Sequence, residues 1–125
     1  MTVYAPGTAE TDPKKQNRAL QAHAAAIEVL QGSPTAKAWV NFTGSTAAIN
    51  SSFNIASVSR TSAGLYVVTF TTAFSSANYV ALVITKGTNL VANVTTQTAS
   101  AVTVQAFNLS GTATDPTSVM VLCFG

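Results

Sequence analysis

The chain has 125 residues, of which 47% are hydrophobic, so it is long and apolar enough for an independent core and too apolar to be disordered. Only 8% of the residues are charged, the net charge is +2, and no basic stripe is interleaved with aromatic residues, which argues against nucleic-acid binding. No apolar run approaches the ~18 residues that span a bilayer, so we expect no membrane insertion.

Serine and threonine make up about a quarter of the chain, so hydroxyl groups must do most of the surface hydration that charges usually do. Such a surface is weakly protected against association. We therefore expect a protein that hides much of itself in an oligomer or that lives outside the crowded cytosol.

Residues 1–11 contain Pro6, Gly7 and small polar residues without periodicity, and we predict an extended arm. The arm is either a free tail or an anchor that becomes ordered when it docks on a larger partner. Residues 1–7 have neither a positive n-region nor an apolar h-region, so we expect no signal peptide.

A helix is predicted for residues 12–32, because Asp12 can cap its first turn, Pro13 fits the first helical position, and Gly32 is placed to end it. One face of this helix has side chains at alternating spacings of four and three residues, which is typical of a coiled-coil seam. The predicted seam consists of Gln16, Leu20, His23, Ile27 and Leu30.

An isolated helix of this length is marginal in water, so the seam needs a partner. We favour self-association, because the Gly-Ser-Pro break at residues 32–34 lets the helix stand apart; packing on the chain's own β-domain is the alternative. Leucine and isoleucine at these positions do not settle dimer against trimer. His23 is expected to form a satisfied polar layer that fixes the register, with a pH-sensitive layer as the alternative.

From residue 36 onward the apolar residues alternate with a period of two and are separated by short turns, which predicts strands. Seven or eight strands indicate an antiparallel β-sandwich over residues 36–125, or a small barrel. The run 79–85 is nearly continuously apolar and is predicted to be a central strand. The predicted strands are 36–42, 47–57, 65–71, 79–85, 90–97, 100–107 and 117–124.

Several short strings in this region form a recognisable series. They are Lys37-Ala-Trp-Val-Asn-Phe42, Gly44, Ala48-Ile49, Ser52-Phe53-Asn54-Ile55, Tyr66-Val67-Val68-Thr69-Phe70-Thr71-Thr72-Ala73 and Ala77-Asn78-Tyr79. The series resembles a β-module often found at the C-terminal end of bacteriophage tail-fibre proteins. The string Thr-Asp-Pro-Lys-Lys-Gln-Asn at residues 11–17 resembles the start of the short helix that precedes this module in small phage fibre proteins. The chain departs from the module at Asn50, where an arginine is usual, and at Leu65, where an aspartate is common.

The resemblance implies a non-enzymatic virion protein, a short trimeric tail fibre or tail-tip adhesin assembled in the host cytoplasm. Residues 1–31 would dock on the phage tail or other virion proteins, and the β-domain would meet a glycan or protein of the host surface. A head fibre, decoration or collar protein without receptor binding is the alternative. A secreted bacterial adhesion module is a third hypothesis, against which the missing signal peptide counts.

Residues that could carry chemistry are few. His23 and Cys123 lie on different elements, and we expect Cys123 to be a small buried hydrophobe, with an interchain or reactive thiol as the alternative. A single cysteine excludes an intrachain disulfide. Of the four acids, only Asp115 lies in the β-domain, where we interpret it as a turn residue. We therefore expect no catalytic residues, no metal site and no cofactor.

Aromatic residues on the strands, Trp39 and Phe42 among them, are predicted to serve core or inter-protomer packing, with Trp39 near the helix. Phe74 differs, because it falls in a connection. Simple strand alternation places the connections 43–46, 73–78 and 96–98 at the end of the domain far from the helix. Phe74, Asn78 and Gln97 are therefore predicted to face a receptor, with ordinary polar turns as the alternative.

Overall fold

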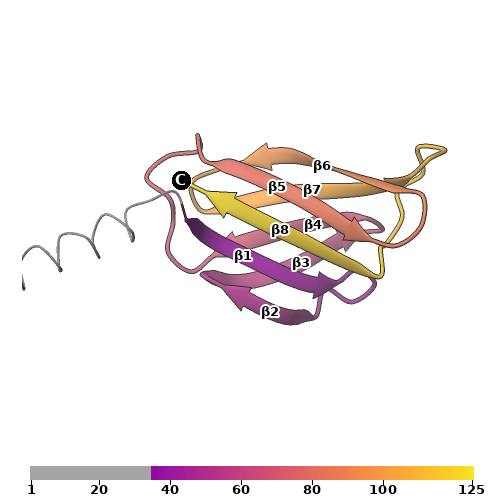
Figure 1. Cartoon of the computed structure of the whole chain (residues 1–125), viewed down its shortest axis with the longest axis horizontal. Coiled ribbons are helices and arrows are strands. Elements are labelled where there is room, and N and C mark those ends of the chain that lie inside the picture. The colour runs from indigo at the N-terminus through magenta and orange to yellow at the C-terminus, as the bar shows by residue number, and fades with distance from the viewer. Residues whose placement is uncertain (1–34) are drawn as a thin grey trace, which may run out of the picture. The chain divides into compact units, whose positions relative to one another are not determined.

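The computed structural model describes residues 35–125. Within this range the chain forms two four-stranded antiparallel sheets that face each other (Figure 1). Sheet A contains β2 (Ile49–Phe53), β1 (Ala36–Thr43), β8 (Ser118–Phe124) and β5 (Val80–Lys86) in spatial order, and sheet B contains β3 (Ile55–Ser62), β4 (Leu65–Phe70), β7 (Ala101–Asn108) and β6 (Leu90–Gln97). The predicted β-sandwich is confirmed, whereas the predicted arm, helix and seam lie outside the described residues.

The core lies between the two sheets and is built from alternate residues of each strand. Phe42 and Tyr66 are both fully buried, and their rings meet edge to face across the two sheets at 5.0 Å. Phe42 therefore belongs to the core, while Trp39 lies on the opposite face of β1. No helix in the part of the chain that the structure describes is long and apolar enough to cross a membrane.

The predicted strand 47–57 is wrong, because the structure has two strands there in different sheets. The chain passes from β2 to β3 at Asn54, whose φ of 58° lies in the left-handed region that asparagine tolerates better than most residues. Its side chain holds the crossing. The amide nitrogen donates to the carbonyls of Lys37 and Thr72 at 3.2 and 3.1 Å, and the amide oxygen accepts from the Thr72 N–H at 2.7 Å.

The missed crossing reverses the direction of the strands that follow it. Ala36 and Val80 both pair with Phe124, so the loop that leads into β5 lies at the end of the sandwich where β1 begins. We call this the proximal end, with loops 71–79 and 98–100, and the opposite one the distal end, with turns 44–48, 63–64 and 87–89 and loop 109–117. The prediction that 43–46, 73–78 and 96–98 share one far end is therefore wrong.

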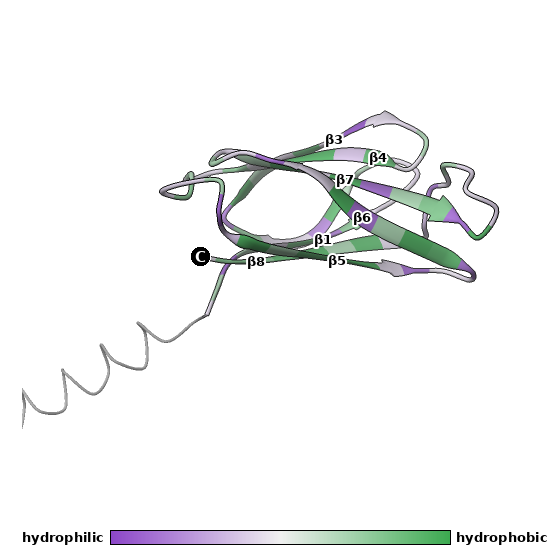
Figure 2. Ribbon diagram, turned by 90° about the horizontal axis from the view of Figure 1, so that it is seen from above, coloured by the Kyte–Doolittle hydropathy of each residue, from purple (hydrophilic) through white to green (hydrophobic). Residues whose placement is uncertain are grey.

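The prediction that 79–85 is a central strand is also wrong, because β5 is an edge strand of sheet A. Its apolar side chains point to both faces. Ala81 and Val83 pack against the core, whereas Val80, Leu82 and Ile84 lie on the outside. The two layers are seen edge-on in Figure 2.

Candidate functional site

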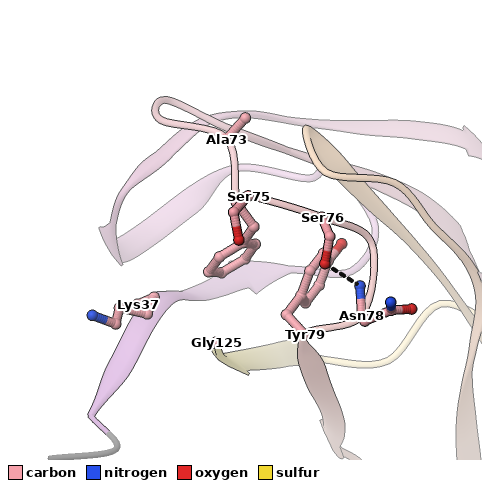
Figure 3. A pocket seen from close by; sticks show the side chains of 8 residues that line it. Lys37, Ala73, Ser75, Ser76, Asn78, Tyr79 and Gly125 are labelled. Carbon is pink, nitrogen blue, oxygen red and sulfur yellow. Dashed lines mark hydrogen bonds between the residues drawn. The ribbon is translucent and has the colours of Figure 1, made fainter.

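The three predicted receptor-facing residues are brought together, at the proximal end. A hollow of about 400 Å³ opens there. Its lining combines an aromatic surface with hydroxyl, amide and ammonium groups (Figure 3). The lining residues are Lys37, Ala73, Phe74, Ser75, Ser76, Asn78, Tyr79 and Gly125.

Phe74 closes the proximal end of the core. Its ring lies 4.9 Å from the ring of Phe70 and 4.2 Å from that of Tyr79, and its N–H donates to the Ala99 carbonyl at 2.8 Å. Phe74 therefore has a structural role that the sequence did not indicate: its ring packs inward and holds the loop against the core. Phe74 also lines the hollow.

Gln97 fixes the same loop from sheet B. Its amide nitrogen donates to the carbonyls of Tyr79 at 2.8 Å and Ala77 at 3.2 Å, so its donor hydrogens are already used. Asn78 instead keeps an exposed side chain, while its N–H donates to the Ser76 hydroxyl at 3.1 Å (Figure 3). The hollow can therefore offer hydrogen bonds to a polar ligand through Asn78 and the serines.

The Tyr79 hydroxyl lies within hydrogen-bond distance of the carbonyls of Thr98 and Ala101, at 2.8 and 3.1 Å. Burial, and then the neighbouring Cys123, raise the pKa of Tyr79 to about 12. Because this folded pKa lies above the ordinary value of 10.0, the stability that the neutral phenol provides is complete below pH 10 and is lost as the pH rises through about 12.

We expect Tyr79→Phe to lower the free energy of unfolding by about 1 kcal/mol at pH 7, because one buried hydrogen-bond donor is lost. The difference from the wild type should shrink between pH 10 and 12, as the wild-type phenol ionises. Urea unfolding over this range measures both values. Parallel curves for the two proteins would contradict the role given to Tyr79.

A second polar cluster lies at the distal end, around Asp115. Its carboxylate accepts from Arg60 Nε at 3.1 Å and from the second guanidinium nitrogen at 2.7 Å. It also accepts from the Gly64 N–H and from the Tyr66 hydroxyl, each at 2.8 Å. Asp115 thereby ties loop 109–117 to β3, β4 and the turn between them.

The Asp115 cluster has clear electrostatic consequences. Hydrogen bonding to Arg60 is the main cause that lowers the pKa of Asp115 to about 2, against the opposing effect of burial. Burial, and then the bond to Asp115, raise the pKa of the Tyr66 hydroxyl. Gly64 is required at its place, since its φ is +71° and a Cβ there would meet the Ala106 carbonyl oxygen at 2.4 Å. These groups form a structural anchor in which the carboxylate is held ionised.

Sequence reasoning interpreted Asp115 as a turn residue and did not find this cluster. Arg60 and Asp115 are 55 positions apart, and only the topology brings them together. The available signal was that Arg60 and Asp115 carry opposite charges in a domain with two other charged residues, Lys37 and Lys86.

Other chemistry-bearing groups of residues 35–125 are few. Cys123 is buried, as predicted, and burial raises the pKa of its thiol to about 11, so it is a poor nucleophile at neutral pH. No group of three or more His, Cys, Asp or Glu side chains within residues 35–125 could hold a metal ion.

No protein-family model matches the chain, and no curated protein or solved structure matches it either. The likeness to phage fibre modules therefore rests on the residues quoted for it.

Proposed function

We propose that this chain is a non-enzymatic phage virion protein, a short trimeric tail fibre or tail-tip adhesin. Residues 1–31 dock it on the tail, and the β-sandwich is presented for recognition of the host surface. The protein acts by holding a rigid domain in place, and it needs no cofactor for this.

The observation that carries this proposal is the way in which the fibre-like strings meet in the fold. Asn54 belongs to one string, and its side chain bonds to Lys37 of a second and Thr72 of a third. The Phe70 ring, in the same string as Thr72, stacks edge to face with Tyr79 of the fourth at 5.5 Å. Residues that resemble the module thus form one bonded corner at the proximal end, which supports treating them as a structural unit.

The distal end suits contact with a host, because Thr35 joins the sandwich at the other end. Loop 109–117 is stiffened there by Asn108, whose side-chain oxygen accepts from the N–H groups of Ser110 and Thr112, both at 3.0 Å. Leu109, beside this turn, is 70% exposed. A rigid loop with an exposed apolar side chain is a favourable contact, since little entropy is lost on binding.

A pair of variants separates the two candidate receptor surfaces. Leu109→Ser should reduce adsorption of labelled protein to host cells at least tenfold and leave the melting temperature unchanged, since this side chain is mostly exposed. Asn78→Ala, in the proximal hollow, is the matched control and should leave adsorption intact. If Asn78→Ala reduced adsorption and Leu109→Ser did not, the receptor would bind the proximal end, at the predicted residues Phe74, Asn78 and Gln97.

Electron microscopy of virions with a gold-labelled antibody against the sandwich tests the assignment as a whole. Label at the tail tip is the expected result. Label on the head would replace the tail fibre by the second candidate, a head fibre, decoration or collar protein. The proximal hollow favours that candidate, because its aromatic and amide groups lie at the end of the sandwich that is joined to the docking region.

Ile27→Asp should lower the mass of the oligomer toward that of the monomer in dilute solution, because it places a charge in the centre of the predicted apolar seam. Ala25→Asp, two residues away and outside the seam, is the control and should leave the mass unchanged. Light scattering on the full chain measures the mass. An Ile27→Asp variant that keeps the mass of the wild type would contradict assembly through the seam.

A further inference from the structure

The outer face of sheet A carries an unbroken patch of apolar side chains. One row crosses all four strands, because Phe53 pairs with Trp39, Trp39 with Leu122, and Leu122 with Leu82. The next row adds Met120 and Ile84, which are also paired. We call these six residues the sheet A patch: Trp39, Phe53, Leu82, Ile84, Met120 and Leu122.

In the single chain the sheet A patch is exposed on its edge strands and partly accessible at its centre, at Trp39, Met120 and Leu122. Phe53 is 54%, Leu82 48% and Ile84 59% accessible, and Val80 beside them is 57% accessible. A hollow of about 380 Å³ lies within the patch, between Trp39, Met120 and Ile84. A surface of this shape can receive protruding apolar side chains.

The outer face of sheet B differs in chemistry. The strand positions that alternate with its core residues are mostly hydroxyl or amide side chains, such as Ser59, Thr103 and Gln105, with fewer apolar ones, among them Val67, Val91 and Phe107. No charged residue lies within the patch, although Lys37 and Lys86 border it at the strand ends of the same face. Arg60 is paired with Asp115. One sheet is therefore suited to water and the other to a covering layer.

The strand sequences agree with this division. Strands β5 and β8 are apolar at nearly every position, a pattern typical of strands that are covered on both faces. In this chain the inner face of β5 and β8 meets the core, and the outer face has no cover from residues 35–125. In a strand with one solvated face, apolar residues alternate with polar ones. The sequences of β5 and β8 do not alternate in this way, which indicates that their outer face is covered in the assembled protein.

We propose that the sheet A patch is a subunit interface, covered by the same face of further copies of this chain. The four most exposed apolar side chains of this face alone leave roughly 300–400 Å² of apolar surface, if each has on the order of 150–200 Å² in full, which is the size of the largest apolar patch of a typical monomer, a patch that is often functional. A stable interface needs roughly 800 Å² per partner, so the partly exposed neighbours and the polar rim of the same sheet must contribute the remainder. The six patch residues themselves are uncharged, and the two lysines of this face, Lys37 and Lys86, lie at its rim.

The predicted N-terminal helix is a less suitable cover. Its seam supplies three large apolar side chains, Leu20, Ile27 and Leu30, against six in the patch. A helix is about 10–12 Å wide, whereas four strands about 4.8 Å apart span more than that. A helix would leave the edge strands β2 and β5, with Phe53 and Ile84, exposed.

Leu82→Asp in the full chain tests this interface, with Val91→Asp as a matched control. Val91 is also an exposed apolar residue on an edge strand, 48% accessible, but it lies in sheet B. Trp39 is the only tryptophan of the chain, so its fluorescence reports on the patch alone. We expect a wild-type mass of two or three copies, and a red shift of the Trp39 emission by several nanometres in Leu82→Asp but not in Val91→Asp.

Two cysteine variants test the same interface by the rate of thiol labelling, without introducing a charged residue into the sheet. Ile84→Cys should react at least tenfold more slowly than Val91→Cys, since the native Cys123 is buried in both proteins. A monomeric wild-type mass, or an oligomer in which the Trp39 emission and the two labelling rates show no difference, would overturn the interface. A dimer would support the interface while contradicting the proposed trimer, and absence from virions would contradict the proposed function alone.

Discussion

Replacing Phe42 with alanine is expected to lower the free energy of unfolding by about 3–5 kcal/mol. The Phe42 side chain is fully buried between the sheets and meets the Tyr66 ring at 5.0 Å, so truncation removes both its burial and an aromatic contact. Urea unfolding measures the loss, which should not depend on protein concentration, because this side chain contributes to the fold of each chain.

Trp39→Ala provides the contrast, since Trp39 lies on the other face of the same strand. Its effect should depend on concentration: the melting temperature of the oligomer falls, while that of the dilute protein changes little. A large loss for Trp39→Ala that is the same at all concentrations would contradict its place in an interface. It would indicate that residues of the same chain cover the patch.

Replacing Asp115 with alanine is expected to lower the free energy of unfolding by about 2–4 kcal/mol at pH 7. The buried Tyr66 hydroxyl donates to Asp115 at 2.8 Å, and truncation leaves this donor without its acceptor. Asp115→Asn keeps an oxygen for Tyr66 and Gly64 and loses the charge and the second acceptor oxygen that face the more exposed Arg60, so its effect should be smaller. Equal losses for the two variants would mean that the ion pair, and not the buried hydroxyl, dominates.

The ionised Asp115 also predicts an acid limit of stability. Its pKa is lowered from 3.8 to about 2 in the folded chain, chiefly by the hydrogen bonds from Arg60. The stability it provides is therefore complete above about pH 4–5 and is lost as the pH falls through about 2. The difference in unfolding free energy between wild type and Asp115→Asn should narrow in this window. A constant difference down to pH 2 would contradict the assignment.

The strands and the core were largely predictable from the sequence, because both follow from a period of two in the apolar residues. The alternation predicted strands over residues 36–42 and 65–71, and the structure has Ala36–Thr43 and Leu65–Phe70 there, with Phe42, Val68 and Phe70 buried. These patterns are local. They do not depend on which strand pairs with which.

What failed depends on topology. Phe53 and Ile55 share the spacing of one strand, and only the left-handed Asn54 between them moves the chain to the other sheet. Because this one crossing was missed, every later loop was predicted at the wrong end of the domain. The loop that holds Phe74 and Asn78 is one of them. The ion pair of Arg60 and Asp115 was hidden for the same reason.

The edge position of β5 shows a different limit. Its apolar run was interpreted as a central strand, on the rule that both faces are then covered by the same chain. The rule identifies a covered strand, but it does not say what covers it. A second copy of the chain could cover the outer face of β5 equally well, and the apolar sequence of Val80–Lys86 is consistent with such a cover.

Electron cryomicroscopy of the assembled virion tests the central proposal most directly. We expect three copies of the sandwich at the tail tip, with the sheet A patches turned toward one another, the proximal ends toward the tail and loop 109–117 outermost. Sandwiches on the capsid, or at the tail with the sheet A patches facing solvent, would contradict it.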